Sequence, residues 1–383
     1  MKQAIISLAN LLDKRYSIVT IEALQLATES WEDSTFLLVI PGGRDAFYNR
    51  DLGGIAAMKI RNYVRNGGKY LGFCGGGYFG CSRVLFEPNS PLEIIGDRPL
   101  GFYPGVCKGA AYPGFNYNNE EKSKVIQISV EKSAFKQQKM SEWMSESDIE
   151  YHDVYYNGGG YFADSDYLGN DLLYEIDMDN FNDDIRKSYY TQVLCRYPSD
   201  VSDPENRTIN VEGAAAIVAC QYGKGIAVLT GVHIEFSYKV FISPTNSLLP
   251  QDQLNRLKSS ERSRQKLFIS ILHYLGLNVS SDAIDIISAT TKKSITPTFI
   301  IPMKNVLESD IVHLILQLGE GSLDNIIHDN HNSFDFTLID SAGPVFIEDV
   351  GDIAADSSGV LVNSVPKDDS LAIVMGKRRL IID

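Results

Sequence analysis

A run of five apolar residues, FLLVI at positions 36–40, stops abruptly at Pro41-Gly42-Gly43. A continuous apolar run that ends at proline and glycine is typical of a strand buried on both faces, as in a parallel sheet. Helical apolar spacing and further short strands surround this run: we expect helices over 2–13 and 55–64, and strands at 16–21 and 69–73. This alternation predicts an α/β fold built on a doubly wound, mostly parallel sheet.

From Tyr78 onward the pattern is less regular. The spacing of Phe79, Val84 and Leu85 predicts a helix of about two turns. The later segments suggest antiparallel strands added to the sheet and one long helix: strands at 125–130 and 193–197, a hairpin of 214–220 and 226–230 around Tyr222–Gly225, and a helix over 251–276.

The composition shifts again after about residue 280. We expect residues 1–280 to form one domain and residues 281–296 to be a linker. Residues 297–383 carry short apolar runs and Asp-rich turns, which suggest a small α+β module. His328 and His331 lie in a polar stretch there, and we predict no metal site because no partner ligands lie nearby.

Charge and cysteine content exclude several classes of protein. The formal net charge is −14 and no Lys/Arg cluster is present, which argues against a nucleic-acid partner. No apolar run approaches the roughly 18 residues that a membrane span needs. The chain has five cysteines without a CxxC pair, a pattern that favours reduced thiols in a cytoplasmic protein over a disulfide framework.

The sharpest local pattern is Gly72-Phe73-Cys74-Gly75-Gly76, with a strand before it and a helix after it. This is the cysteine form of a nucleophile elbow, in which small residues allow a tight turn and the helix start favours a thiolate. The backbone N–H of Gly75 could then face an oxyanion. The alternative is that Cys74 is a small core residue, as most free cysteines are, but the flanking glycines favour the elbow.

A cysteine nucleophile needs a base and a residue that orients the base. Gly231-Val232-His233-Ile234-Glu235 follows an apolar strand, and side chains two positions apart share one face of an extended segment. Glu235 could therefore orient His233, which would act on Cys74. A lone histidine would more often be structural, so this hypothesis depends on the three residues together.

The segment after the FLLVI run supplies the remaining candidates. Open α/β sheets place ligands at the carboxyl ends of their strands, where Pro41-Gly42-Gly43 leaves N–H groups free. We expect Gly43 to be a second oxyanion donor and Asp45 and Tyr48 to line the pocket. A turn aspartate and a packed tyrosine are equally compatible with those two positions.

In this order, the strand–PGG, GFCGG and GVHIE segments resemble the class I glutamine amidotransferase fold, which is flavodoxin-like. A longer set of motifs resembles the N-terminal half of eukaryotic, fungal-type biotin–protein ligases: PGGRDAFY (41–48), GGKYLGFCGGGYFGCSRVLFE (67–87), FYPGVCKGAAYPGFNYN (102–118), YYNGGGYF (155–162) and LTGVHIEF (229–236). The resemblance covers about residues 1–280. It is weaker over 281–383, where it implies the connector that precedes the ligase catalytic domain.

Three departures from that family pattern bear on function. The family opens with a strand and a glycine-rich turn that this sequence does not show, and we expect that strand between those carrying Ile40 and Phe73. Ile234 stands where relatives usually have proline. The Gly-Arg-Gly-Arg-Gly loop for biotin and adenylate and the Lys-Trp-Pro-Asn segment are absent, so we do not expect this chain to biotinylate proteins.

The resemblance implies one of two functions. The chain could be a regulatory or substrate-recognition module of a biotin–protein ligase, with the ligase catalytic domain and biotin-acceptor carboxylases as partners. Alternatively, Cys74, His233 and Glu235 could form an active amidohydrolase site for a small amide such as glutamine. Neither function implies a cofactor. We favour the first because biotin ligation consumes no ammonia.

Overall fold

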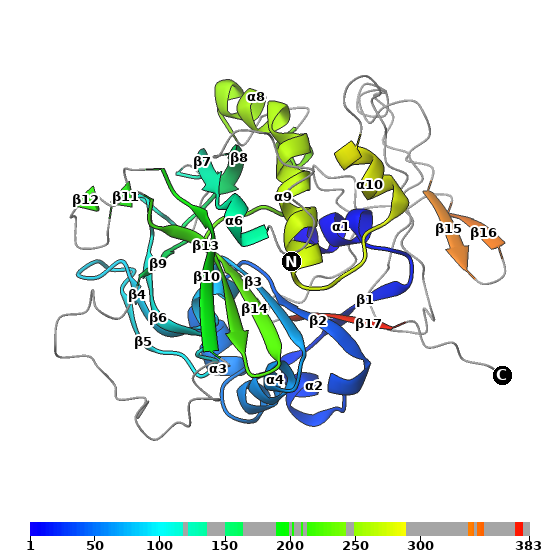
Figure 1. The fold of residues 1–383 in the computed structure, drawn as a ribbon, viewed down its shortest axis with the longest axis horizontal. Coiled ribbons are helices and arrows are strands. Elements are labelled where there is room, and N and C mark those ends of the chain that lie inside the picture. Colours follow the sequence, from blue (N-terminus) through cyan, green and yellow to red (C-terminus); the bar gives the residue numbers. More distant parts are fainter. Residues whose placement is uncertain are drawn as a thin grey trace.

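The computed structural model describes residues 1–117, 122–135, 150–163, 189–198, 201–202, 208–209, 213–242 and 249–288, together with three strands at 336–340, 343–347 and 372–377. The chain forms an α/β fold in which one strongly twisted sheet runs through the molecule and helices cover it (Figure 1). No helix in these ranges is long and apolar enough to cross a lipid bilayer.

Helices and strands alternate in the first part of the chain, and strands dominate the middle. The helices are α1 (Lys2–Leu11), α2 (Ala23–Thr28), α3 (Asp45–Asp51), α4 (Ile55–Arg65), α5 (Gly75–Phe79), α6 (Lys132–Phe135), α8 (Gln251–Ser259), α9 (Glu261–Tyr274) and α10 (Ser281–Ser288). The strands are β1 (Tyr16–Ile21), β2 (Thr35–Ile40), β3 (Lys69–Phe73), β4 (Cys81–Phe86), β5 (Ile94–Asp97), β6 (Tyr103–Gly109), β7 (Lys124–Val130), β8 (Glu150–Tyr156), β9 (Tyr161–Ala163), β10 (Tyr189–Arg196), β11 (Val201–Ser202), β12 (Thr208–Ile209), β13 (Ala215–Tyr222), β14 (Gly225–Thr230), β15 (Phe336–Asp340), β16 (Gly343–Ile347) and β17 (Ala372–Lys377).

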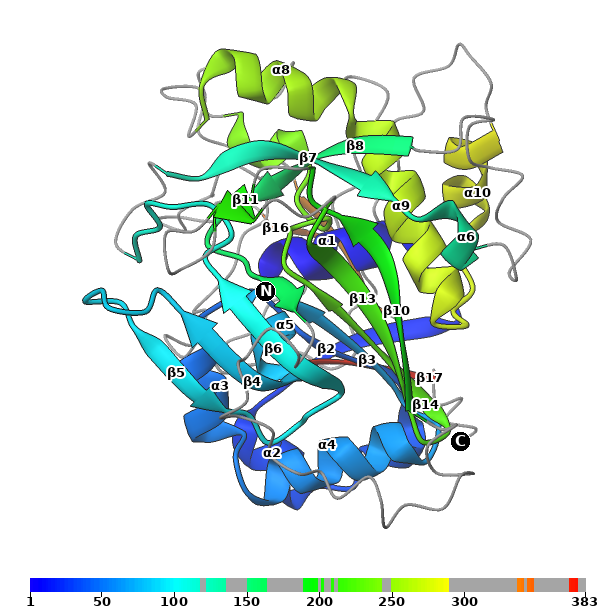
Figure 2. The same ribbon diagram turned by 60° about the vertical axis from the view of Figure 1, so that its left-hand side comes forward.

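The main sheet has the strand order β1-β17-β2-β3-β14-β13-β9-β6-β4-β5, and β10, β7 and β8 extend it from β13 (Figure 2). Strands β2, β3 and β14 pair in parallel at its centre. The β13–β14 hairpin and the pairs around β10, β7 and β8 are antiparallel. The expected α/β class with antiparallel additions is confirmed, but the described sheet is mixed rather than mostly parallel: β2–β3, β3–β14 and β4–β6 pair in parallel, and its other pairs are antiparallel.

Strand β2 shows why the FLLVI run is wholly apolar. Leu37 and Val39 pack into the core beneath α1 and α9, whereas Leu38 and Ile40 pack into a second core with α4. Successive side chains of a strand point to opposite faces, so a strand covered by helices on both sides must be apolar throughout. Figure 2 shows α2, α3 and α4 on one side of this part of the sheet and α1 and α9 on the other.

Two predicted helices differ from the structure. The helix expected from Tyr78 for about two turns ends at Phe79, and Cys81–Phe86 is instead strand β4, paired with β5 and β6. Val84 and Phe86 of this strand are buried in the second core, because alternate side chains of a strand point to the same face. The long helix over 251–276 is divided into α8 and α9 at Ser260, whose hydroxyl accepts a hydrogen bond from the Asp153 backbone N–H.

The expected place of the family's first strand was wrong. Strands β2 and β3 pair directly, with Ile40 opposite Gly72, so no strand lies between them. The position between β1 and β2 is filled by β17, which runs antiparallel to both neighbours. In a flavodoxin-type order, 2-1-3-4-5, this is the place of the first strand. A segment more than three hundred residues away in the chain therefore completes the sheet.

The boundaries at residues 280 and 296 remain predictions. Residues 281–288 of the expected linker form α10, which packs against α9. Residues 289–296, His328 and His331 lie outside the described residues.

Candidate functional site

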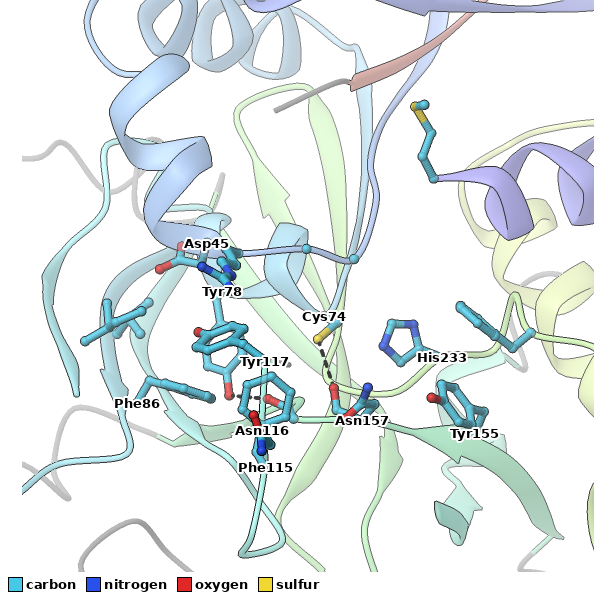
Figure 3. Close-up of a pocket in the computed structure, with 18 of the residues that line it drawn as sticks. Asp45, Cys74, Tyr78, Phe86, Phe115, Asn116, Tyr117, Tyr155, Asn157 and His233 are labelled. Atoms are coloured by element: carbon cyan, nitrogen blue, oxygen red, sulfur yellow. Dashed lines mark hydrogen bonds between the residues drawn. The ribbon is translucent and has the colours of Figure 1, made fainter. Parts of the chain in front are cut away.

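Cys74 lies on a tight turn between β3 and α5. Its backbone has φ 46° and ψ −101°, a conformation that non-glycine residues rarely adopt. The Cys74 N–H donates to the Thr230 carbonyl at 2.8 Å, and this bond ties the turn to the end of β14. The side chain reaches a cavity and donates from Sγ to the Asn157 carbonyl at 3.7 Å (Figure 3). The turn therefore has the strained geometry of a nucleophile elbow.

His233 lies beside Cys74 on the same cavity (Figure 3). Its Nδ1 is 2.7 Å from Glu235 Oε1, and both side chains are almost fully buried. Burial by itself would lower the pKa of His233, but the Glu235 carboxylate and hydrogen bonding with Cys74 outweigh it and raise that pKa to about 10. The imidazole is therefore charged at neutral pH and can donate a proton to a group near Cys74.

Bonds from three different elements fix the segment that carries His233 and Glu235. The His233 N–H donates to the Tyr155 carbonyl of β8 at 3.0 Å. The Ser7 hydroxyl of α1 donates to the Glu235 carbonyl at 2.6 Å, and the buried Arg264 guanidinium of α9 donates to the Ile234 carbonyl. These hydrogen bonds fix the backbone that positions the His233 and Glu235 side chains.

Glycines 42, 43 and 75 allow the two turns to approach each other and the histidine. A Cβ atom on Gly75 would lie 2.2 Å from the Gly43 carbonyl oxygen and 3.0 Å from the Gly43 nitrogen. A Cβ atom on Gly42 would lie 2.8 Å from His233 Cε1. Any larger residue would therefore push these backbones apart or displace the imidazole. The contact between the backbones of Gly43 and Gly75 is compatible with the expected pair of oxyanion donors.

The two remaining candidates, Asp45 and Tyr48, have different surroundings. Asp45 lines the cavity but is held by Arg98, whose Nε lies 2.9 Å from each carboxylate oxygen. Tyr48 does not line the cavity, contrary to expectation. It is fully buried, and its hydroxyl donates to the Pro41 carbonyl at 3.0 Å, so it supports the Pro41–Gly43 turn from inside the core.

The cavity around Cys74 has a volume of about 520 Å³. Several residues that line it have no role that the sequence alone indicates, namely Arg44, Phe115, Asn116, Tyr117, Tyr155, Asn157 and Phe236. Their only signal was their place in the segments 41–48, 102–118, 155–162 and 229–236, which carry the family resemblance. The aromatic members of this set add apolar surface to a lining that is otherwise mostly polar.

The other four cysteines lie in the core. Cys81, Cys107, Cys195 and Cys220 are at most 1% exposed, against 8% for Cys74. Burial raises the pKa of each of these four thiols, which keeps them protonated and unreactive. Within the part of the chain that the structure describes, no group of His, Cys, Asp and Glu side chains is arranged to hold a metal ion.

Comparison with known proteins gives one family and two sequence relatives. A family model described as "Biotin-protein ligase, N terminal" matches residues 1–301. The biotin–protein ligase of Schizosaccharomyces pombe is 31% identical over 348 residues, which cover 90% of this chain and 45% of that protein. An uncharacterized protein of Chlamydia muridarum is 34% identical over 208 residues, 54% of this chain and 62% of that protein. The chain thus spans less than two thirds of either relative.

Solved structures give more distant similarities. PurLQS from Thermotoga maritima matches 63% of this chain and 80% of its own, with a TM-score of 0.31 and 15% identity. The cytoplasmic protein STM1381 from Salmonella typhimurium matches 70% of this chain and 79% of its own, with a TM-score of 0.28 and 13% identity.

Proposed function

Because this chain belongs to the biotin-protein ligase N-terminal family, we propose that it is a regulatory or substrate-recognition module of such a ligase and does not transfer biotin itself. The family membership confirms the resemblance drawn from the sequence motifs. The observation that carries the proposal is the family match over residues 1–301, together with the absence from the sequence of the glycine–arginine loop for biotin and adenylate. The partners proposed are the ligase catalytic domain and biotin-acceptor carboxylases.

The cavity over Cys74 is the ligand site of this module. His233 lies between Cys74 and its partner Glu235 there, and bonds from α1, α9 and β8 hold the segment that carries His233 and Glu235. A small ligand bound in this cavity would contact the ends of β2, β3 and β14 at once. Its binding energy could therefore change how the sheet edge meets a partner domain.

A biotin-transfer assay tests this proposal. The purified chain is incubated with labelled biotin, ATP and a carboxyl-carrier acceptor domain, with the S. pombe ligase as the positive control. We expect no labelled acceptor from this chain alone, and measurable binding of the unlabelled acceptor in a titration calorimeter. Labelled acceptor in the absence of the control ligase would contradict the proposal.

The geometry also favours a second candidate function, a cysteine amidohydrolase. In this reaction the Cys74 thiol gives its proton to water and Sγ bonds to the carbonyl carbon of an amide, while the N–H groups of Gly43 and Gly75 stabilise the oxyanion. The C–N bond then breaks as His233 protonates the leaving amine. Water, deprotonated by His233, finally attacks the thioester, the S–C bond breaks to release the acid, and the Cys74 sulfur regains its proton from solvent. Glu235 holds the imidazole throughout.

Ammonia release from glutamine separates the two functions, with Cys74→Ala as the control. A binding module gives no release above the Cys74→Ala background. Release that is lost in Cys74→Ala would establish the amidohydrolase in its place.

A further inference from the structure

Arg44 places a positive charge on the wall of the Cys74 cavity. It follows Gly42 and Gly43 directly and lines the cavity together with Cys74 and His233. Its Cζ lies 4.2 Å from the ring centroid of Tyr117 and 5.5 Å from that of Phe47, so two aromatic faces hold the half-buried guanidinium in place. Tyr117 and Cys74 face the same cavity (Figure 3).

The charges around the cavity leave Arg44 uncompensated. Asp45 is neutralised by Arg98, which lies behind it, and Glu235 is paired with His233. Among the residues that the structure describes, Arg44 has no carboxylate partner, although the whole chain carries a net charge of −14. Once each of these two carboxylates is counted with its cationic partner, Arg44 is left as one unpaired positive charge on the cavity wall, where a ligand can reach it.

The size and walls of the cavity limit the ligand further. A volume of about 520 Å³ suits a small molecule, and Phe115, Tyr117, Tyr155 and Phe236 offer apolar contact to its carbon skeleton. We propose that Arg44 makes this cavity selective for small carboxylate-bearing compounds, with the carboxylate paired to Arg44 and an electrophilic carbon at Cys74 Sγ. This inference rests on the thiol site proposed above and adds the chemical class of its ligand.

Iodoacetate and iodoacetamide are a matched pair of probes for this selectivity. Both alkylate a thiol in the same way: an S–C bond forms, the C–I bond breaks, iodide leaves and the thiol proton goes to water, because His233 already carries its proton at pH 7. The probes are nearly equal in size and differ in charge. Mass spectrometry identifies which cysteine carries the product. We expect Cys74, because the other four cysteines are at most 1% exposed.

The experiment compares rates on the full chain at pH 7, each divided by the rate of the same reagent with glutathione. We expect the normalised rate of Cys74 with iodoacetate to exceed that with iodoacetamide by roughly tenfold. Arg44→Gln should lower the iodoacetate rate by roughly five- to tenfold and change the iodoacetamide rate by less than about twofold. Arg44→Lys, which keeps the charge, should recover most of the preference.

Arg50→Gln is the matched control, because Arg50 also lies over the Phe47 ring, at 4.8 Å, but does not line the cavity. It should leave both rates unchanged. If Arg44→Gln lowers both rates equally, or leaves the iodoacetate preference intact, Arg44 does not select the ligand and the inference fails. If Cys74 is not alkylated ahead of the other cysteines, the thiol site itself is wrong, which is a distinguishable result.

Discussion

His233 Nδ1 lies 2.7 Å from Glu235 Oε1, and both side chains are almost fully buried. The second carboxylate oxygen, Glu235 Oε2, has no hydrogen-bond partner in the described part of the chain. The negative charge of Glu235 is therefore balanced mainly by the imidazole. A buried carboxylate with a single cationic partner strongly favours the charged imidazolium, and that cation lies next to Cys74.

This pair should make the stability of the protein depend on pH. The pKa of His233 is raised to about 10, against about 6.5 in an unfolded chain. The stabilisation is therefore complete below pH 6.5 and is lost as the pH rises toward 10. We expect Glu235→Gln to lower the free energy of unfolding by about 3 kcal/mol at pH 6, and by much less at pH 10.

Urea denaturation at the two pH values measures this difference. Glu150→Gln is the control, since His152 Nε2 lies 3.4 Å from Glu150 Oε1 but burial lowers the pKa of His152. That variant should not show a destabilisation that fades with rising pH. A Glu235→Gln effect of equal size at pH 6 and pH 10 would mean that the pair does not hold a proton.

Gly42→Ala tests the contact between the Pro41–Gly43 turn and the imidazole. The added Cβ would lie 2.8 Å from His233 Cε1, so the ring must shift. We expect roughly tenfold slower alkylation of Cys74 by iodoacetamide and a loss of about 1–2 kcal/mol of stability. The same substitution in a His233→Asn background should change the rate little. An unchanged rate in the single variant would show that the ring position does not matter.

The buried pair of Asp45 and Arg98 should be strongly coupled. The Arg98 Nε lies 2.9 Å from both Asp45 carboxylate oxygens. The Asp45 side chain is 6% exposed and the Arg98 side chain 4%. Asp45→Asn and Arg98→Met should each cost about 3–5 kcal/mol, because each leaves a buried charge without its partner. The double variant should lose much less stability than the two single variants lose when their losses are added. Additive effects in urea denaturation would rule out the coupling.

Strand β17 should contribute to the stability of the sheet. Val374 lies opposite Val19 of β1 and Leu38 of β2. Val374→Pro removes a backbone N–H from a central strand, and we expect it to cost about 2–3 kcal/mol. Val374→Thr keeps the N–H group and should cost less than about 1 kcal/mol. Equal thermal melts for the proline variant and the wild type would show that this strand does not pair in solution.

The parts of the fold that could be predicted from the sequence are those set by residues close together in the chain. The buried β2 strand, the Cys74 turn and the β13–β14 hairpin depend on short apolar runs and glycines, so each segment carries its own signal. Strand β17 pairs with residues over three hundred positions away, and no local pattern indicates such a pairing.

The same distinction holds at the site. Cys74, His233 and Glu235 could be found because their spacing follows from a turn and an extended segment. The Asn157 carbonyl and the aromatic wall of Phe115 and Tyr117 come from segments whose place depends on the whole sheet. The β4 strand was predicted as a helix because apolar residues at 79, 84 and 85 are compatible both with the 3.6-residue period of a helix and with the two-residue period of a strand.

The central claim is that Cys74 and His233 act together as one thiol site, and the rate at which iodoacetamide alkylates Cys74 at pH 7 tests it most directly. We predict that wild-type Cys74 reacts faster than glutathione and ahead of the four core cysteines, and that His233→Asn slows its alkylation by at least roughly tenfold. Equal rates for the wild type and His233→Asn, in folded proteins with matching thermal melts, would contradict the account.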